Sequence, residues 1–448
     1  MLKLNLANLN RFLYEIPMAA LPPTFKDTFD VTRKLGVRYL WIDSLCIVQD
    51  SDADWRAESS VMGKIYGQSL CNIAATGSSQ THGGLFQGRD ISKITPATMS
   101  IKSEGQETTY CFPDNEIWCS EITNAPLNSR GWVLQERMLS PRTLHYASQL
   151  FWECRTMEAC ETYPSGISDR WCEPLHCDKF TNHPLSLKGW KDESSDDQWD
   201  QIIQSYTPCR LTRTSDRLIA IAGIAMDFQS LWGDYYLAGL WKNHLPRCLL
   251  WEFCNSKGRF EKLERYRCKL PGSRKWIERG LIKLGPSWSW ASLNFESAEI
   301  YFPLPEHVKT ELVKVVDAQI HGKPNNFGDF TGGFIKLEGR IGRIFPASSS
   351  SQGEYKNGYY SYEICFDVNE GIGEAVPWCI PIAIEHEKVA QCLMLRPVDQ
   401  QNLSFTRIGL VHVSMDLEAD IPHELQWIKE YALMDRTCCN DLTVVTII

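Results

Sequence analysis

Hydrophobic positions in the first part of the chain change their spacing repeatedly, and the changes predict alternating helices and strands. Apolar residues at helical spacing predict a helix over residues 23–35, entered through a proline pair and ended by Gly36. The continuous apolar run Tyr39–Ile42 then predicts a strand buried on both faces of a sheet. Helical spacing returns over residues 52–66, and residues 70–75 predict a second short strand. This order of elements is typical of an α/β architecture.

Polar side chains gather where the first predicted strand ends. Asp43 stands at its carboxyl end, and Ser51 offers an N-cap for the next helix, with Asp54 as the return partner of a capping box. Ligands of open α/β sheets bind beyond the carboxyl ends of the strands. We therefore predict a cleft at this loop. Its candidate residues are Asp43, Ser44, Cys46, Gln49 and Asp50.

Glu58 falls on the inward stripe of the second predicted helix, between Trp55 and Met62. A buried or half-buried carboxylate requires a partner, a hydrogen bond or a proton. Two interpretations stay open. Glu58 belongs either to a structural ion pair or backbone hydrogen bond, or to the cleft, as its acid/base or ribose-binding carboxylate.

A second run, residues 128–154, predicts a short helix stopped by Pro141 and strands after it, and residues 91–119 predict strands or a hairpin. Arginines in this run either bind a phosphate or carboxylate of a ligand or neutralise acidic groups inside the fold. The run contributes five further cleft candidates: Arg130, Trp132, Gln135, Glu136 and Arg137.

The pattern changes after residue 155. Polar residues rich in Pro, Ser and Asp predict a linker or exposed loop, and residues 214–228 and 237–253 then predict helices. After residue 293, period-two patterning predicts an antiparallel β unit. The predicted divisions are an α/β domain over 1–155, a linker over 156–205 and a helical, then β-rich region over 206–448.

Charge and hydrophobicity exclude several classes of partner. The net charge is −9 and no cluster of Lys and Arg occurs, so we expect no nucleic-acid binding. No apolar stretch is long enough to span a bilayer, and the N-terminus does not have the pattern of a signal peptide. These features predict a cytoplasmic protein without a transmembrane segment.

Cysteine spacing and motif content leave the chemistry open. The 17 cysteines are scattered and odd in number, which predicts free thiols. The densest group contains no CxxC pair, so we predict no metal site; it consists of Cys154, Cys160, Cys172 and Cys177, with His176 and His183 nearby. Dinucleotide-binding, P-loop, hydrolase-elbow and HExxH motifs are absent from the sequence.

Two runs carry a family resemblance: LGVRYLWIDSLCIVQDSDADWRAESSVMGKIYGQSLCNIAATGSSQTHGGLF and LNSRGWVLQERMLSPRTLHYASQLFWEC. Over residues 21–154 the chain resembles the fungal heterokaryon incompatibility (HET) domain family. LTRTSDRLIAIAGIA, YLAGLWKNHLPRCLLW, PSWSWAS and TVVTII are similar to the C-terminal region that accompanies this domain. The resemblance implies an effector of non-self recognition and programmed cell death that acts with protein partners.

The resemblance also implies a fold and a reaction. The HET family has been related to the TIR domain, a flavodoxin-like fold in which some members cleave NAD with a glutamate on a helix beside the sheet. This relation implies Glu58 as the catalytic candidate and NAD as the substrate, with no certain cofactor. A carboxylate can stabilise the oxocarbenium-like centre that forms as the glycosidic bond breaks.

One departure from the family bears on these expectations. Family members usually begin with a strand and turn resembling YxALSYxWG, whereas this chain begins LKLNLANLNRFLYEIP. The resemblance therefore implies a flavodoxin-like or TIR-like α/β domain that lacks its usual first strand. Two alternatives to an enzyme stay open, a non-catalytic interaction or scaffold module and an inactive, N-terminally truncated family copy.

Overall fold

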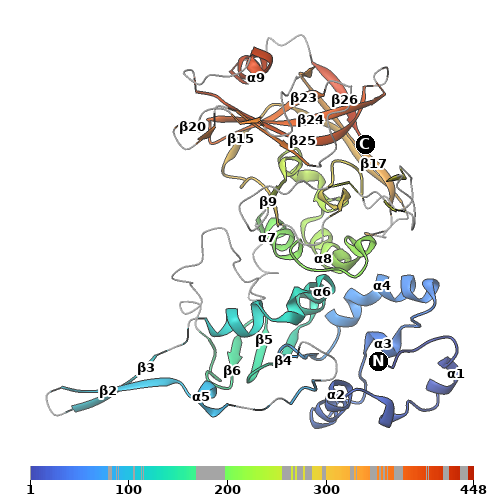
Figure 1. The fold of residues 1–448 in the computed structure, drawn as a ribbon, viewed down its shortest axis with the longest axis vertical. Coiled ribbons are helices and arrows are strands. Elements are labelled where there is room, and N and C mark those ends of the chain that lie inside the picture. The colour runs from blue at the N-terminus through green and yellow to red at the C-terminus, as the bar shows by residue number, and fades with distance from the viewer. Residues whose placement is uncertain are drawn as a thin grey trace. The chain divides into compact units, whose positions relative to one another are not determined.

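The computed structural model divides the chain into two compact units, Met1–Glu193 and Ser194–Ile448 (Figure 1). Each unit is described by itself. The structure describes residues 2–78, 83–86, 88, 90–103, 106–112, 114, 116–167, 197–254, 264–265, 268–269, 276–277, 285–294, 299–322, 327–328, 330–343, 351–352, 355–356, 359–360, 362–367, 377–399, 401, 403–416, 423–433 and 442–448. Four members of the Cys/His group named above, Cys172, His176, Cys177 and His183, lie outside the described residues, as does most of the expected linker.

Helices open the N-terminal unit and confirm two sequence predictions. They are α1 (Leu9–Phe12), the 3-10 turn η1 (Met18–Ala20), α2 (Pro23–Lys34), α3 (Asp43–Cys46) and α4 (Asp52–Gly67). Gly36, at φ +70°, takes the left-handed conformation that lets the chain leave α2. Ser51 caps α4, because its hydroxyl accepts the Asp54 N–H at 3.3 Å. The capping box is not closed, since the Asp54 carboxylate accepts the Val48 N–H at 2.7 Å.

The predicted buried strand Tyr39–Ile42 is wrong. This segment is extended, but it forms no ladder with another described strand, and Tyr39 is 79% exposed. Asp43 consequently begins the short helix α3 and does not end a strand. Four consecutive large apolar residues satisfied the hydrophobic pattern, but a strand also requires a neighbour for its backbone groups.

The sheet of the N-terminal unit has four strands in the order β1–β4–β5–β6. Their bounds are Asn72–Ala74 for β1, Arg142–Tyr146 for β4, Leu150–Cys154 for β5 and Glu158–Cys160 for β6. Only β1 and β4 are parallel, whereas β4–β5 and β5–β6 are antiparallel. The α/β character is therefore confirmed, but the expected parallel sheet is reduced to one parallel pair among the described strands of this unit.

Short helical segments pack around this sheet. They are α5 (Ile91–Ile94), the π-helical turn η2 (Cys119–Thr123), the 3-10 turn η3 (Pro126–Ser129) and α6 (Gly131–Leu139). Trp118 and Ile122 from the η2 region pack against Phe151 of β5 in one apolar cluster. A second cluster joins Leu21 and Phe25 to Leu45, which ties α2 to α3.

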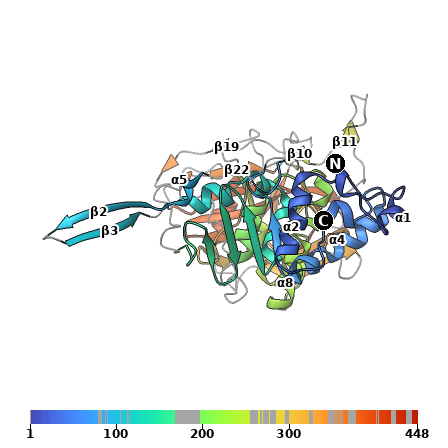
Figure 2. The ribbon, with the colours of Figure 1, turned by 90° about the horizontal axis from the view of Figure 1, so that it is seen from below.

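A hairpin formed by β2 (Ala97–Ser103) and β3 (Gln106–Phe112) projects from the body of the N-terminal unit (Figure 2). It confirms the strands predicted for this region. Directly paired residues share a face, so Met99 and Tyr110 lie on the same face as Ile101 and Phe112. All four are between 45% and 50% exposed. The hairpin is therefore amphipathic, with its apolar face uncovered by any described residue of the chain.

The C-terminal unit opens with helical elements that differ from two predictions. Residues 214–228 contain two 3-10 turns before a helix, and residues 237–253 contain no α-helix. The elements are α7 (Asp197–Tyr206), η5 (Thr214–Asp216), η6 (Ile219–Ile221), α8 (Ala222–Trp232), β7 (Tyr236–Leu237), β8 (Leu240–Trp241), η7 (Lys242–His244), η8 (Arg247–Leu250) and β9 (Glu252–Cys254). Ala238 and Gly239, at φ +48° and +97°, form the tight turn that pairs β7 with β8.

The larger sheet of the C-terminal unit has ten strands and confirms the predicted β-rich region. Its main order is β15–β23–β24–β25–β26–β17–β16, with β18 beside β23, β22 beside β25 and β19 beside β22. The bounds are β15 (Val308–Glu311), β16 (Lys314–Gly322), β17 (Phe330–Gly339), β18 (Gly342–Arg343), β19 (Ser351–Gln352), β22 (Tyr362–Phe366), β23 (Trp378–Glu385), β24 (Val389–Asp399), β25 (Ser404–Ser414) and β26 (Thr443–Ile447). All pairings are antiparallel except β25–β26.

Smaller elements complete the unit. Helix α9 (His423–Leu433) packs Leu425, Ile428 and Tyr431 against apolar residues of the ten-stranded sheet. The remaining short elements are β10 (Glu264–Arg265), β11 (Cys268–Lys269), β12 (Trp276–Ile277), η9 (Trp290–Ser292), β13 (Leu293–Asn294), β14 (Glu299–Tyr301), β20 (Tyr355–Lys356) and β21 (Tyr359–Tyr360). Within the described part of the chain, no helix combines the length and the apolar character that a membrane crossing demands.

Candidate functional site

The N-terminal unit contains a pocket of about 620 Å³, a volume in the usual range for small-molecule sites. Three segments form most of its wall: one side of α2, the extended segment that follows it, and the start of β1. The lining residues are Thr24, Phe25, Thr28, Thr32, Leu35, Val37, Tyr39, Leu40, Trp41, Ile42, Asp43, Ile65, Tyr66, Ser69, Leu70, Cys71, Asn72, Ile73, Arg130 and Glu136.

Helix α2 presents three threonines to the pocket at intervals of one turn. The hydroxyl of Thr28 donates to the carbonyl of Thr24, and that of Thr32 donates to Thr28, both at 2.7 Å. Because these hydroxyls bond within the helix, the methyl groups remain as the free contact surface. The α2 wall is therefore largely apolar, which suits a flat or apolar part of a ligand.

The extended segment and β1 contribute backbone as well as side chains. Residues 38–41 form no backbone hydrogen bond with any described residue, and β1 pairs with β4 along one edge only. Trp41 packs edge-on against Tyr66 of α4, with ring centroids 5.7 Å apart. The pocket thus combines aromatic rings with unpaired peptide groups, which can donate and accept hydrogen bonds.

The ionisable centre of the pocket is Glu136 on α6. Burial raises the pKa of Glu136 to about 7, and the nearby Asp43 carboxylate adds to the rise. Arg130, which precedes α6, and a hydrogen bond from the Tyr66 phenol both lower this pKa, but burial outweighs them. A carboxyl group with a pKa near neutrality is suited to general acid/base work.

Tyr66 is the partner that sequence reasoning did not place in the site. Burial raises the pKa of its phenol well above the usual value, and the negative charges of Glu136 and Asp43 raise it further. Tyr66 therefore stays protonated and donates to Glu136. Tyr66 lies in the last turn of α4, and its contact with Glu136 on α6 is a tertiary feature that local spacing does not show.

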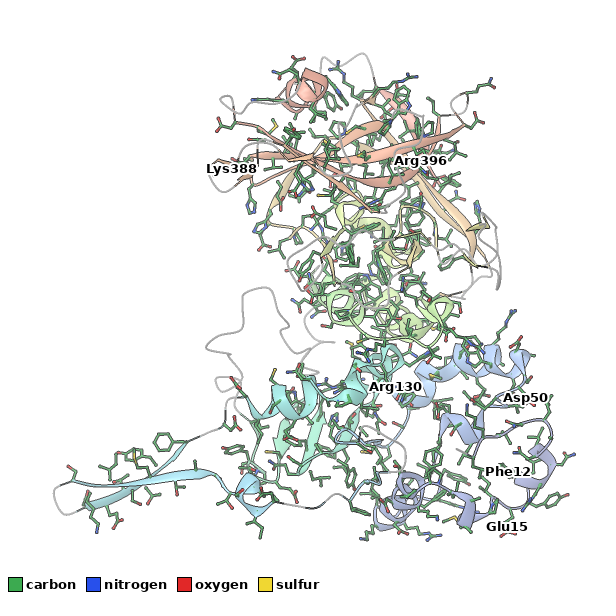
Figure 3. The ribbon with its side chains drawn as sticks, in the orientation of Figure 1. Phe12, Glu15, Asp50, Arg130, Lys388 and Arg396 are labelled. Carbon is green, nitrogen blue, oxygen red and sulfur yellow. The ribbon has the colours of Figure 1, made fainter. Side chains whose placement is uncertain are left out.

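Three of the predicted cleft residues come together here, namely Asp43, Arg130 and Glu136. Asp43 reaches the pocket from the start of α3, where one carboxylate oxygen also accepts the Ser44 N–H at 2.6 Å. Arg130 is the residue before α6, and Figure 3 labels it there. The start of α3, the residue before α6 and α6 itself, not the end of a strand, supply the charged groups of this pocket.

Glu58 is half-buried on α4 and does not line the pocket. Its nearest electrostatic link to the site is Cys46, whose thiol pKa is raised first by burial and then by the charges of Glu58 and Asp43. Cys46 is itself exposed and does not line the pocket. The predicted placement of Glu58 inside the cleft is therefore not observed.

The other loop candidates lie outside the pocket lining. Ser44 is buried, Gln49 donates through its side-chain amide to the carbonyls of Asp43 and Ile47 at 3.2 and 3.1 Å, and Asp50 accepts the Leu6 N–H at 2.8 Å. Figure 3 shows Asp50 apart from Arg130. These contacts hold the loop between α3 and α4 in place.

The remaining α6 candidates serve the interior of the unit. Trp132 packs edge-on against Trp55 with ring centroids 6.4 Å apart, which joins α6 to α4, and Gln135 is buried. Arg137 forms an ion pair with Glu153 of β5, and the same carboxylate bonds to His145 at 3.1 Å. The His145 ring in turn bonds to the Thr76 hydroxyl at 2.9 Å. Helix α6 therefore directs Glu136 to the pocket and Arg137 into the sheet.

The geometry defines the N-terminal unit as an α/β domain with a ligand-sized pocket and a half-buried carboxyl group whose pKa is raised. Residues 6–136 match the family model described as "Heterokaryon incompatibility protein (HET)". This stretch, which covers most of the N-terminal unit, is therefore a heterokaryon incompatibility domain. No match was found among curated proteins or among solved structures.

Proposed function

We propose that this protein is a fungal incompatibility-type effector, active in non-self recognition and programmed cell death, and that its N-terminal unit cleaves NAD. The membership of that unit in the HET domain family supports the first part. The carboxyl group of Glu136, in a pocket with Asp43 and Arg130, supports the second.

The reaction requires breakage of the N-glycosidic bond between nicotinamide and ribose. Water adds to the ribose carbon, nicotinamide leaves with the bonding electrons as a neutral base, and the proton of the water is released. Ionised Glu136 would stabilise positive charge on the ribose and accept this proton. Arg130 carries the charge that a pyrophosphate needs, and Asp43 can accept hydrogen bonds from ribose hydroxyls.

Glu58 remains the second carboxylate candidate, by its relation to TIR domains. Glu58 does not line the pocket, whereas Glu136 does, so the position of Glu136 supports it as the carboxylate at the ribose. Separate substitution of the two residues distinguishes these roles, because only the group at the ribose should control the chemical step.

The test is NAD consumption by the purified full chain and by cells that express it. We expect Glu136→Gln to reduce kcat by about 10²–10⁴-fold, the range for loss of a general acid or base. Activity of the unaltered protein should rise as pH increases through about 7, because the ionised form of Glu136 is the active one. Glu107→Gln, on the exposed hairpin, is the matched control and should leave kcat unchanged.

Two results contradict the enzyme proposal. One is cell death with undiminished NAD, and the other is a Glu136→Gln variant as active as the unaltered protein. If Glu58→Gln alone abolishes cleavage, then the catalytic carboxylate is Glu58 and the role given to Glu136 is wrong.

The amphipathic hairpin β2–β3 favours a second candidate function, a non-catalytic interaction module. Met99, Ile101, Tyr110 and Phe112 form an exposed apolar face, which is characteristic of protein-binding surfaces. Under this alternative, Met99→Ser with Tyr110→Ser should abolish cell death, whereas Glu136→Gln should leave it intact. The enzyme proposal expects Glu136→Gln to abolish it.

A further inference from the structure

Two histidines and a glutamate converge in the C-terminal unit, far from the pocket in sequence. His307 immediately precedes β15, Glu385 is the last residue of β23, and His386 follows it. Val308 pairs with Glu385 in the β15–β23 ladder, and the N–H of His386 donates to the carbonyl of His307 at 2.8 Å. The ladder therefore brings the three side chains to one end of the sheet.

The possible ligand atoms of these side chains lie close together. One ligand atom each from His307, Glu385 and His386 lies within 4.8 Å of the other two. The two imidazole rings are in contact, with centroids 3.8 Å apart and ring planes tilted by 41°. His307 and Glu385 are half-buried and His386 is exposed, so an ion from solvent has access to all three.

The turn between β23 and β24 contains two residues with positive φ, His386 at +51° and Glu387 at +59°. Positive φ is uncommon for residues other than glycine, although Asn, Asp and His adopt it more often than the others. This turn lies beside the residue before β15, since the His386 N–H bonds to the His307 carbonyl. Figure 3 marks the position of this turn with Lys388.

Glu385 is oriented by a neighbour in the sheet. The side-chain amide of Gln391, which is 3% exposed, donates to Oε2 of Glu385 at 2.5 Å. This bond occupies one carboxylate oxygen and leaves Oε1 as the ligand atom. Hydrogen bonds of this kind, from a second residue to a ligating carboxylate, fix ligand orientation in metal sites.

We propose that His307, Glu385 and His386 bind a divalent transition-metal ion of the zinc type. Two imidazole nitrogens and one carboxylate oxygen are a ligand set for Zn²⁺, Co²⁺ or Ni²⁺, whereas Mg²⁺ and Ca²⁺ prefer oxygen ligands alone. Three protein ligands leave a fourth position of a tetrahedral ion for water. A bound ion would fasten the start of β15 to the β23–β24 turn.

Sequence spacing could not predict this site. The glutamate and one histidine are adjacent, but the other histidine precedes β15, a strand that pairs with β23 only when the sheet forms. The site is independent of the Cys/His group considered from the sequence, since none of its residues is shared.

The test uses the full chain after removal of metal with a chelator, titrated with Zn²⁺ by calorimetry. We expect the affinity for Zn²⁺ to fall by about 10–100-fold or more when either histidine is replaced. His386→Asn is the preferred variant, because Asn tolerates the positive φ and so preserves the turn. His307→Asn is the second variant, and His321→Asn, an exposed histidine of β16, is the matched control.

Cysteines could also bind zinc, so a second measurement identifies the ligands. Co²⁺ in the proposed site should give visible d–d bands without the near-ultraviolet charge-transfer band of a thiolate ligand. Three results would overturn the proposal. The unaltered protein could bind Zn²⁺ no more tightly than the His386→Asn variant, or both histidine variants could keep full affinity. The third is a Co²⁺ spectrum whose sole signal is the thiolate band.

Discussion

Arg137 and Glu153 form a bidentate ion pair in which Nε and Nη2 of the arginine each donate to one carboxylate oxygen at 2.6 Å. Glu153 is fully buried, and burial alone would raise its pKa, but Arg137 and His145 together lower the pKa to about 2. Glu153 therefore remains ionised in the interior because two donors from α6 and β4 converge on it. The pair fastens α6, and with it Glu136, to the sheet.

Removal of this carboxylate should destabilise the N-terminal unit. We expect Glu153→Gln to lower the free energy of unfolding by about 3–5 kcal/mol, because the buried guanidinium of Arg137 loses its counter-ion. Urea unfolding followed by tryptophan fluorescence measures the change. The control is Lys102→Gln, which breaks the exposed pair with Glu107 at 3.5 Å and should shift the free energy by less than about 1 kcal/mol.

Glu136 should make stability depend on pH in the opposite sense from a paired carboxylate. Its folded pKa of about 7 lies above the ordinary value of 4.5, so the folded state binds more protons than the unfolded state between these two values. The free energy of unfolding should consequently fall as pH rises from about 4.5 to 7. Glu136→Gln should remove this slope, which urea unfolding at several pH values would reveal; an unchanged slope contradicts the assignment.

Tyr66 should control how readily Glu136 ionises. The hydrogen bond from its phenol lowers the pKa of Glu136. Tyr66→Phe removes that donor while it keeps the ring that packs against Trp41, so the Glu136 pKa should rise above about 7. Difference infrared spectroscopy of the carboxyl band, with Glu136→Gln as the blank, measures the shift. A fall in the pKa would show that the phenol does not donate to this carboxyl.

Arg407 should be the most sensitive charged position of the C-terminal unit. Its fully buried guanidinium pairs with Asp367 at 2.8 Å, donates to the Trp251 carbonyl at 2.7 Å and lies over the Trp251 ring, 3.4 Å from the centroid. We expect Arg407→Met to lower the free energy of unfolding by about 3–5 kcal/mol, since Asp367 is left unpaired. Urea unfolding measures this change. The control is Lys314→Met, at an exposed position of β16, which should change the free energy of unfolding by less than about 0.5 kcal/mol.

Sequence patterns predicted the helices whose ends are determined by residues next to them in the sequence. Helix α2 begins at a proline and ends near Gly36, and α4 begins at the Ser51 cap, so their ends could be predicted from the sequence. Predictions of helices and strands failed where contacts with distant parts of the chain determine the local structure. The Ala238–Gly239 turn, for example, interrupts an apparent helical pattern. Trp290 packs so closely against this turn that a Cβ at Gly239 would lie 2.6 Å from it. The conformation of the turn is thus coupled to a residue that is distant in sequence.

The sequence indicated charged residues of the candidate site but not how they are arranged in space. Asp43, Arg130 and Glu136 stood out as charged groups among large apolar residues, and all three line the pocket. The contact between Glu136 and Tyr66 was not predictable, since it depends on the packing of α6 against α4. Arg137, next to Glu136 in sequence, faces the sheet, because adjacent residues on a helix point in different directions.

The exposed hairpin β2–β3 has a practical consequence for protein engineering. Every residue of β2 is exposed, and among the described strands β2 pairs with β3 alone, so its hydrogen bonds can open without loss of the packed sheet. Backbone amides there should exchange with solvent within seconds, and a protease should cleave there first. An epitope tag or fluorescent label placed at the tip of the hairpin would report on the intact domain without disturbing its core.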